Sequence, residues 1–162
     1  MKKVVTLFLS LAAVFAMTGC DNDEVFNAEE QLQIDIRLID QFLADNFLTA
    51  MVDEATDLRY IITQEGTGDN AGFGNSVEVH YRGYLLDGTE FDTSVGRGPL
   101  TFVLGRGDVI RGWDIGFQKL NVGAQATLLL PSGLAYGNSR GPAGDLAPNS
   151  VLLFDVTVID IR

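Results

Sequence analysis

Apolar residues in the segment 27–48 recur every three to four positions, as one face of an α-helix requires. Glu29 and Glu30 stand in the first turn, where the helix dipole favours negative charge. The pattern predicts a helix over 27–48. Its broad apolar face needs a cover, which is either the domain that follows or the same helix in a second copy of the chain. The predicted stripe consists of Leu32, Ile36, Ile39, Leu43 and Phe47, widened by Ile34, Leu38 and Phe42.

Beyond residue 57 the apolar positions alternate with polar ones, so the period changes from that of a helix to that of a strand. Asp87-Gly88 is a tight-turn signal between two such runs. Only the segment 111–120 interrupts this pattern, and it predicts one short helix. We therefore expect an α+β fold, in which an antiparallel sheet packs against that helix and a longer helix precedes it. The predicted strands are 58–64, 77–85, 101–104, 124–130 and 151–161.

The first twenty residues have a different pattern. Two lysines open the chain, an almost purely apolar run covers 4–17, and small residues lead to Cys20. This order predicts a secretory signal, and the run is shorter than the roughly 20 residues that span a bilayer. Cys20 resembles the lipid-modified cysteine of bacterial lipoproteins. We expect a signal peptide over 1–19 and a lipidated tether over 20–26. The expected location is the cell envelope of a Gram-negative-type bacterium, on the periplasmic side or the surface of the outer membrane. Plain secretion is the alternative.

Charge and cysteine content exclude several classes of function. The chain has 11 Lys and Arg against 22 Asp and Glu, for a net charge of −11, and removal of 1–19 leaves 9 against 22, or −13. A phosphate backbone would be repelled, so we expect no nucleic-acid partner. Cys20 is the only cysteine, which leaves no intramolecular disulfide and no thiolate metal site.

One pattern associated with catalysis lacks the context that it needs. Residues 137–141 read G-x-S-x-G, but prolines and glycines follow, so no helix begins there. The single histidine, His80, lies upstream of Ser139, whereas a nucleophile-elbow fold has it downstream. His80 stands on the polar face of a predicted strand, where we expect a cross-strand hydrogen bond. We predict no metal site and no cofactor.

Five aromatic residues lie in short stretches with a recognisable pattern: VHYRG at 79–83, DGTEFDTS at 87–94, VIRGW at 109–113, PSGLAYG at 131–137 and LLFDV at 152–156. In order and spacing, these stretches resemble the FKBP family of peptidyl-prolyl cis/trans isomerases over 67–162. The resemblance implies a half-barrel sheet wrapped around the short helix, with an active-site pocket between them. We assign 58–162 to this domain and 27–57 to an N-terminal helical segment.

The resemblance also implies the roles of individual residues. Trp113 would be the floor of the pocket, Asp92 the polar group beside the bound imide, and the Ile110 N–H and Tyr136 hydroxyl the donors to substrate carbonyls. We expect Asp92, Tyr136, Ile110 and Phe91 to act in catalysis. The residues expected to bind substrate are Tyr81, Leu100, Phe102, Val109, Trp113, Leu146 and Phe154.

Two departures from the family pattern concern the pocket. Leu100 stands where the family usually has an aromatic residue, which opens one wall, and Asp145 and Leu146 stand where two bulky aliphatic residues are common. The expected partners are proline-containing polypeptides, with a macrolide as a plausible ligand. The competing hypotheses are a non-catalytic module that binds proline segments, and an envelope protein that acts through its helix at 27–48, including as a homodimer.

Overall fold

The computed structural model of the chain describes residues 27–141 and 146–162. The predicted signal peptide, Cys20 with its tether, and Asp145 lie outside the described residues. Within them, no helix is both long enough and apolar enough to cross a membrane.

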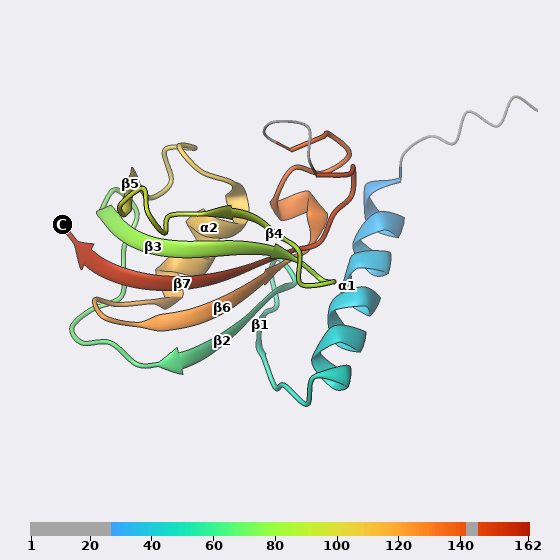
Figure 1. Ribbon diagram of the computed structural model, residues 1–162, viewed down its shortest axis with the longest axis horizontal. Helices are drawn as coiled ribbons and strands as arrows, with labels where there is room; N and C mark the ends of the chain where they lie inside the picture. The colour runs from blue at the N-terminus through green and yellow to red at the C-terminus, as the bar shows by residue number, and fades with distance from the viewer. Residues whose placement is uncertain (1–26, 142–145) are drawn as a thin grey trace, which may run out of the picture.

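One antiparallel sheet dominates the structure, with a strand order of β1-β2-β6-β7-β3-β4 and with β5 paired to β3 (Figure 1). β3 and β7 are its longest strands and pair along their length. The predicted α+β fold is confirmed. The strands are β1 Met51–Asp53, β2 Leu58–Gln64, β3 Ser76–Leu85, β4 Glu90–Thr93, β5 Leu100–Val103, β6 Gln125–Leu130 and β7 Leu152–Ile161.

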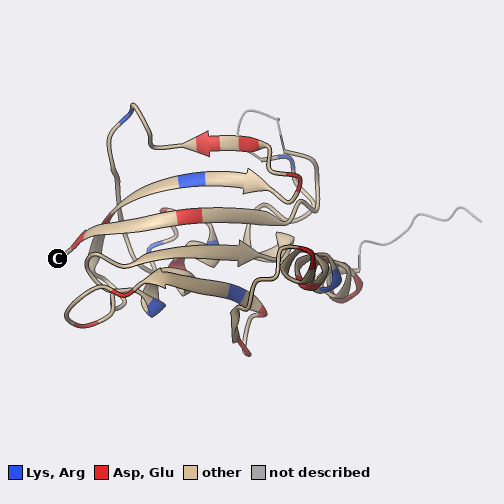
Figure 2. Ribbon diagram, turned by 60° about the horizontal axis from the view of Figure 1, so that its bottom comes forward, with Lys and Arg blue, Asp and Glu red and all other residues tan. Residues whose placement is uncertain are grey.

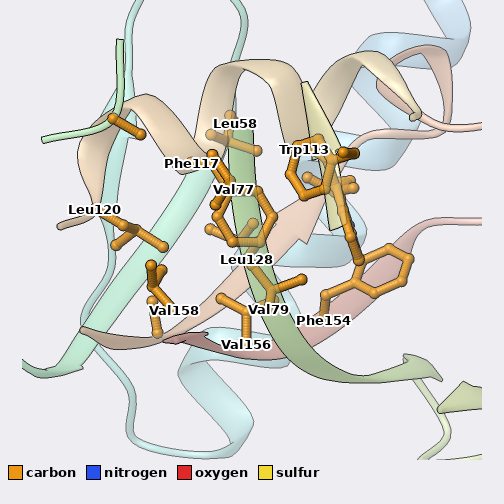
Figure 3. Packing of buried hydrophobic residues seen from close by; sticks show 14 of the residues in the cluster. Leu58, Val77, Val79, Trp113, Phe117, Leu120, Leu128, Phe154, Val156 and Val158 are labelled. Carbon is orange, nitrogen blue, oxygen red and sulfur yellow. The ribbon is translucent and has the colours of Figure 1, made fainter. Parts of the chain in front are cut away.

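The short helix α2 (Arg111–Gly116), extended by a 3-10 turn η1 (Phe117–Lys119), packs against one face of this sheet. Two glycines make the approach possible. A Cβ on Gly112 would lie 2.7 Å from a methyl of Leu130, and one on Gly116 would lie 2.8 Å from a methyl of Leu128. The helix therefore sits directly on β6, and its apolar side chains enter the core with those of β3 and β7 (Figure 3).

The N-terminal helix α1 (Ala28–Asp45) lies across one end of the sheet (Figure 1). The Asn27 side chain caps it by accepting hydrogen bonds from the N–H groups of Glu29 and Glu30. Ile39 is fully buried against the sheet, whereas Ile34 and Leu38 face solvent. The apolar face of α1 is therefore covered by the chain's own domain, which is one of the two covers that the sequence allows. The core beneath α1 consists of Ile39, Leu129, Val151 and Leu153.

The helix is shorter than the sequence predicts, because it ends at Asp45 instead of residue 48. Phe47 adopts a left-handed φ of 55°, and the Leu48 N–H closes the last turn by donating to the Leu43 carbonyl over 2.9 Å. Phe47 is 96% exposed, so its assignment to the buried stripe is wrong.

Acidic side chains outnumber basic ones over the surface, and the few lysines and arginines are dispersed (Figure 2). Two of these basic side chains form ion pairs that join neighbouring elements. Arg59 of β2 lies 3.5 Å from Asp40 of α1, and Lys119 of η1 lies 2.7 Å from Asp53 of β1. The Lys119 hydrogen bond, first among several causes, lowers the pKa of Asp53.

Candidate active site

A pocket of about 170 Å³ opens between β3, β4, β7, the start of α2 and the turn after η2 (Ser132–Leu134). Segments far apart in sequence supply its walls. Nine of the eleven predicted catalytic and substrate-binding residues line it, together with Asp108. The lining residues are Tyr81, Phe91, Asp92, Leu100, Asp108, Val109, Ile110, Trp113, Tyr136 and Phe154.

Trp113 is the centre of an edge-to-face aromatic cluster (Figure 3). Its ring centroid lies 5.0 Å from that of Tyr81 at 79° and 5.2 Å from that of Phe154 at 85°. Such T-shaped pairs add about 0.5–1.5 kcal/mol each beyond the burial of their area. The indole Nε1–H is buried and has no acceptor within 27–141 and 146–162, so packing alone orients the ring.

Gly83 explains how two phenylalanine walls fit over β3. A Cβ at this position would lie 2.7 Å from Phe91 Cζ and 2.9 Å from Phe154 Cε1. These two rings meet at 84° with centroids 5.6 Å apart. The last residue of the VHYRG stretch is therefore a glycine because the rings occupy the space that a side chain would take.

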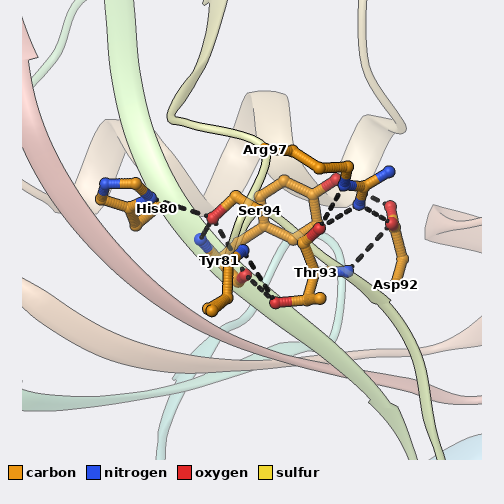
Figure 4. A network of polar contacts seen from close by, with 7 residues as sticks. His80, Tyr81, Asp92, Thr93, Ser94 and Arg97 are labelled. Carbon is orange, nitrogen blue, oxygen red and sulfur yellow. Dashed lines mark hydrogen bonds and ion pairs between the residues drawn. The ribbon is translucent and has the colours of Figure 1, made fainter.

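Asp92 is held in place by a network of polar contacts (Figure 4). The Tyr81 hydroxyl donates to Asp92 Oδ2 over 2.7 Å, the Thr93 N–H donates to Oδ1 over 2.9 Å, and Arg97 forms an ion pair with the same carboxylate. Burial raises the pKa of Asp92, but the bonds from Tyr81 and Arg97 outweigh it, so the pKa is lowered overall. The group is therefore a carboxylate at neutral pH.

The two tyrosines of the pocket stay protonated under the same conditions. Burial, and then the hydrogen bond to Asp92, raises the pKa of Tyr81 to about 12. Burial, and then the negative charge of Asp92, raises the pKa of Tyr136. Tyr81 already donates its proton to Asp92, whereas the Tyr136 hydroxyl has no hydrogen-bond partner among the described residues. Tyr136 is therefore free to donate to a ligand.

Ile110 offers a second donor. It is the N-cap of α2, with an extended backbone, and its carbonyl accepts from the N–H groups of Trp113 and Asp114. Its own N–H donates to no acceptor in the described part of the chain. An extended peptide could therefore pair with this backbone at the rim of the pocket.

Two predicted binding residues lie outside the pocket. Phe102 is 4% exposed and packs beneath Trp113 with its centroid 5.6 Å away, and Leu146 is 2% exposed within the main core. Leu100, by contrast, is at the rim and 39% exposed, so this wall is open.

Arg97 and Asp108 belong to the site but are absent from the sequence prediction. Arg97 follows Asp92 by five residues in a turn flanked by Gly96 and Gly98, and a lone cation between glycines was the available signal. Asp108 directly precedes the predicted Val109.

The other motifs behave as structural elements. His80 Nδ1 lies 3.0 Å from Ser94 Oγ, which confirms the expected cross-strand hydrogen bond (Figure 4). No helix follows the G-x-S-x-G stretch at 137–141, as far as the structure describes the chain beyond it, which is over residues 146–162. Within 27–141 and 146–162, no three His, Cys, Asp or Glu side chains are grouped so that they could hold a metal ion.

Comparisons with known proteins agree with this geometry. Residues 68–159 match the sequence model of the family described as FKBP-type peptidyl-prolyl cis-trans isomerase. The chain is 43% identical over 99 residues to an FK506-binding protein of Neisseria meningitidis serogroup A, covering 60% of this chain and 90% of that protein. It is 49% identical over 90 residues to the peptidyl-prolyl cis-trans isomerase Fkbp12 of Drosophila melanogaster, covering 55% and 82%. It is 47% identical over 99 residues to FK506-binding protein 1 of Saccharomyces cerevisiae, covering 59% and 86%.

Proposed function

Because the chain belongs to the FKBP-type peptidyl-prolyl cis-trans isomerase family, we propose that it rotates X-Pro peptide bonds in the pocket above Trp113. The enzyme class predicted from the sequence is confirmed by this membership. The observation that carries the site assignment is one aromatic floor with two edge-on aromatic walls, next to two hydrogen-bond donors that have no acceptor among the described residues.

An apolar pocket suits this reaction because of how the barrier arises. Amide resonance holds the X-Pro bond planar against a barrier of about 18–20 kcal/mol, and uncatalysed isomerisation takes tens to hundreds of seconds. Twisting the bond removes the resonance and its charge separation, so the transition state is less polar than the ground state. Walls such as Phe91, Val109 and Phe154 then favour the twisted amide over the planar one.

The polar groups supply orientation. The Ile110 N–H and the Tyr136 hydroxyl donate to carbonyls that flank the proline and hold the peptide in a fixed pose. Asp92 remains a carboxylate beside the reacting bond, fixed by Tyr81 and Arg97. None of these steps forms a covalent bond to the protein.

A protease-coupled assay on short X-Pro peptides tests the proposal. We expect the wild-type protein to accelerate isomerisation and Asp92→Val and Phe91→Ala to lose most of that acceleration. Asp69→Val, which changes an exposed acid on a remote loop, is the matched control and should retain it. Absence of acceleration over several X residues, in a protein with native circular dichroism, would refute the catalytic function.

The exposed Leu100 favours one alternative, a module of the same fold that binds proline segments without turnover. Peptide binding in the absence of acceleration would support it. Relatives that carry the name FK506-binding protein also support a macrolide as a ligand of the same pocket. Trp113 is the only tryptophan, so quenching of its fluorescence reports binding of either ligand.

We also propose that the protein is a lipid-anchored foldase of the cell envelope that acts on exported polypeptides. The support is the sequence pattern that ends at Cys20. Labelling of cells with radioactive palmitate should mark the wild-type chain in the membrane fraction but leave Cys20→Ser unlabelled. Equal labelling of both would contradict the anchor. Sedimentation with and without 27–48 tests the remaining prediction of a homodimer.

A further inference from the structure

Asp35 is a fully buried acid on α1 that the proposed reaction does not use. Its carboxylate accepts three hydrogen bonds. Gln31 Nε2 donates to Oδ1 over 2.7 Å, and the Ser132 N–H and hydroxyl donate to Oδ2 over 2.8 and 2.6 Å. A buried carboxylate is costly unless it is paired or hydrogen-bonded in this way, so the site is built around it.

Ser132 connects this carboxylate to the pocket. Its carbonyl accepts from the N–H of Ala135 over 2.9 Å and from the N–H of Gly137 over 2.8 Å. Tyr136, whose hydroxyl faces the substrate in the proposed function, lies between these two residues. The position of the Tyr136 backbone is thus set on both sides by one serine, which in turn is held by Asp35.

Direct hydrogen bonds join α1 to the segment that carries η2. A cavity of about 270 Å³ lies beside this joint, lined by residues of α1 and of the segment that carries η2, among them Asp35 and Ser132. The helix itself is firmly seated, because Ile39 is fully buried against the sheet and Asp40 pairs with Arg59. The seated helix therefore acts as a fixed support for the turn, through the Asp35 carboxylate.

We propose that Asp35 is a positioning residue that holds the Tyr136 hydroxyl where it can donate to the substrate, an inference that rests on the proposed function. The N-terminal helix then has a part in catalysis in addition to its structural part. Loosening the bond to Ser132 displaces the Tyr136 donor and leaves the aromatic floor intact, because Trp113 is held by other contacts.

A double-mutant cycle tests this coupling. Asp35→Asn keeps the shape but removes the negative charge. The two Ser132 donors then meet either a neutral carbonyl oxygen, which accepts more weakly, or an N–H₂ group, which does not accept. We expect kcat/KM to fall about five-fold, since small displacements of positioning groups are costly. In a Tyr136→Phe background the same change should have almost no effect, because the hydroxyl that it positions is gone. Asp45→Asn, an exposed acid on the same helix whose side chain, among the described residues, bonds only to Gln41 of that helix, should leave kcat/KM unchanged.

A merely structural role predicts something different, namely that Asp35→Asn lowers kcat/KM by the same factor with or without the Tyr136 hydroxyl. That result, or unchanged activity in a folded variant, would overturn the inference. If Asp35→Asn does not fold, Ser132→Ala removes only the hydroxyl contact and is taken through the same cycle with the same expectations.

Amide hydrogen exchange separates this inference from the proposed function. In Asp35→Asn we expect the Ala135 and Gly137 amides to exchange about ten-fold faster, while the Leu128 amide in β6 keeps its wild-type rate. Unchanged exchange at Ala135 and Gly137 would overturn the inference whatever the activity. Absence of isomerase activity in the wild type would instead overturn the proposed function.

Discussion

Substitution of Gly83 by alanine tests whether the phenylalanine rings above it form the pocket walls. The new Cβ would lie 2.7 Å from Phe91 Cζ and 2.9 Å from Phe154 Cε1, where ordinary contacts begin at 3.4 Å. The Phe91 ring must therefore move by about 0.7 Å and the Phe154 ring by about 0.5 Å. The φ of Gly83 is not in the left-handed region, so the backbone accepts alanine and the effect is one of packing.

The expected cost has two parts. Overpacking of this kind lowers the free energy of unfolding by about 1–3 kcal/mol, partly offset by the smaller entropy loss of alanine on folding, about 0.5 kcal/mol. Displacement of two walls by more than half an ångström should lower kcat/KM about ten-fold, since a shift of about 1 Å can cost 100-fold.

Urea unfolding and the coupled isomerase assay measure both parts under conditions in which each variant is folded. Gly133→Ala is the matched control, because a Cβ there meets no atom within 4 Å. We expect it to keep wild-type activity and to gain about 0.5 kcal/mol of stability, because the same entropy difference acts there without overpacking. If Gly83→Ala loses stability but retains wild-type kcat/KM, the rings over Gly83 are not catalytic walls.

Four further predictions concern single groups of the pocket. Tyr136→Phe should lower kcat/KM about three- to ten-fold, the value of one lost hydrogen bond, yet change the unfolding free energy by less than about 0.5 kcal/mol; a large loss of stability would show that the hydroxyl has a structural partner. Asp92→Asn should lower the pKa of Tyr81 from about 12 but leave it above the usual value of about 10, because burial is the larger cause of the raised pKa. The absorbance of tyrosinate during alkaline titration measures this pKa. An unchanged value would contradict the hydrogen bond from Tyr81 to Asp92. Folding lowers the pKa of Asp92, so its carboxylate contributes to stability above about pH 4, and this contribution is lost as the pH falls through the folded-state pKa. The urea midpoint of Asp92→Asn should therefore fall less steeply between pH 5 and 2 than that of the wild type. Leu100→Phe should close the exposed wall and tighten binding of FK506 about five-fold, as measured by quenching of the single tryptophan; weaker binding would show that the added ring obstructs the pocket.

Periodicity in the sequence predicts most of the fold because the period of apolar residues is a local property. The segment 58–64 is β2 as predicted, and the predicted strand 151–161 differs from β7 by one residue. β1 is not predicted, because its three residues are too few to show a period and it exists only through pairing with β2. The helix end at Asp45 is also missed, since Phe47 rarely adopts the left-handed conformation that terminates the helix.

Where the sequence motifs are specific, the residues that they predict do line the pocket, as Asp92, Trp113 and Tyr136 do. The site differs from the sequence prediction where contacts between segments that are distant in sequence determine which residues line the pocket. The Phe102 side chain points from β5 into the core, so its ring packs against Trp113 and does not line the pocket. Arg97 enters the site because a turn brings its guanidinium back to Asp92.

The sequence by itself determined the family, the order of elements from residue 58 onward and the identity of the pocket floor, because each depends on local period or on short ordered motifs. Only the tertiary structure decided what covers α1 and what Asp35 does. An apolar stripe specifies that a helix must be buried but not against which partner, since the hydrophobic effect has no direction. A hydrogen bond does have direction, and that between Asp35 and Ser132 joins residues 97 positions apart, a distance over which no sequence pattern acts.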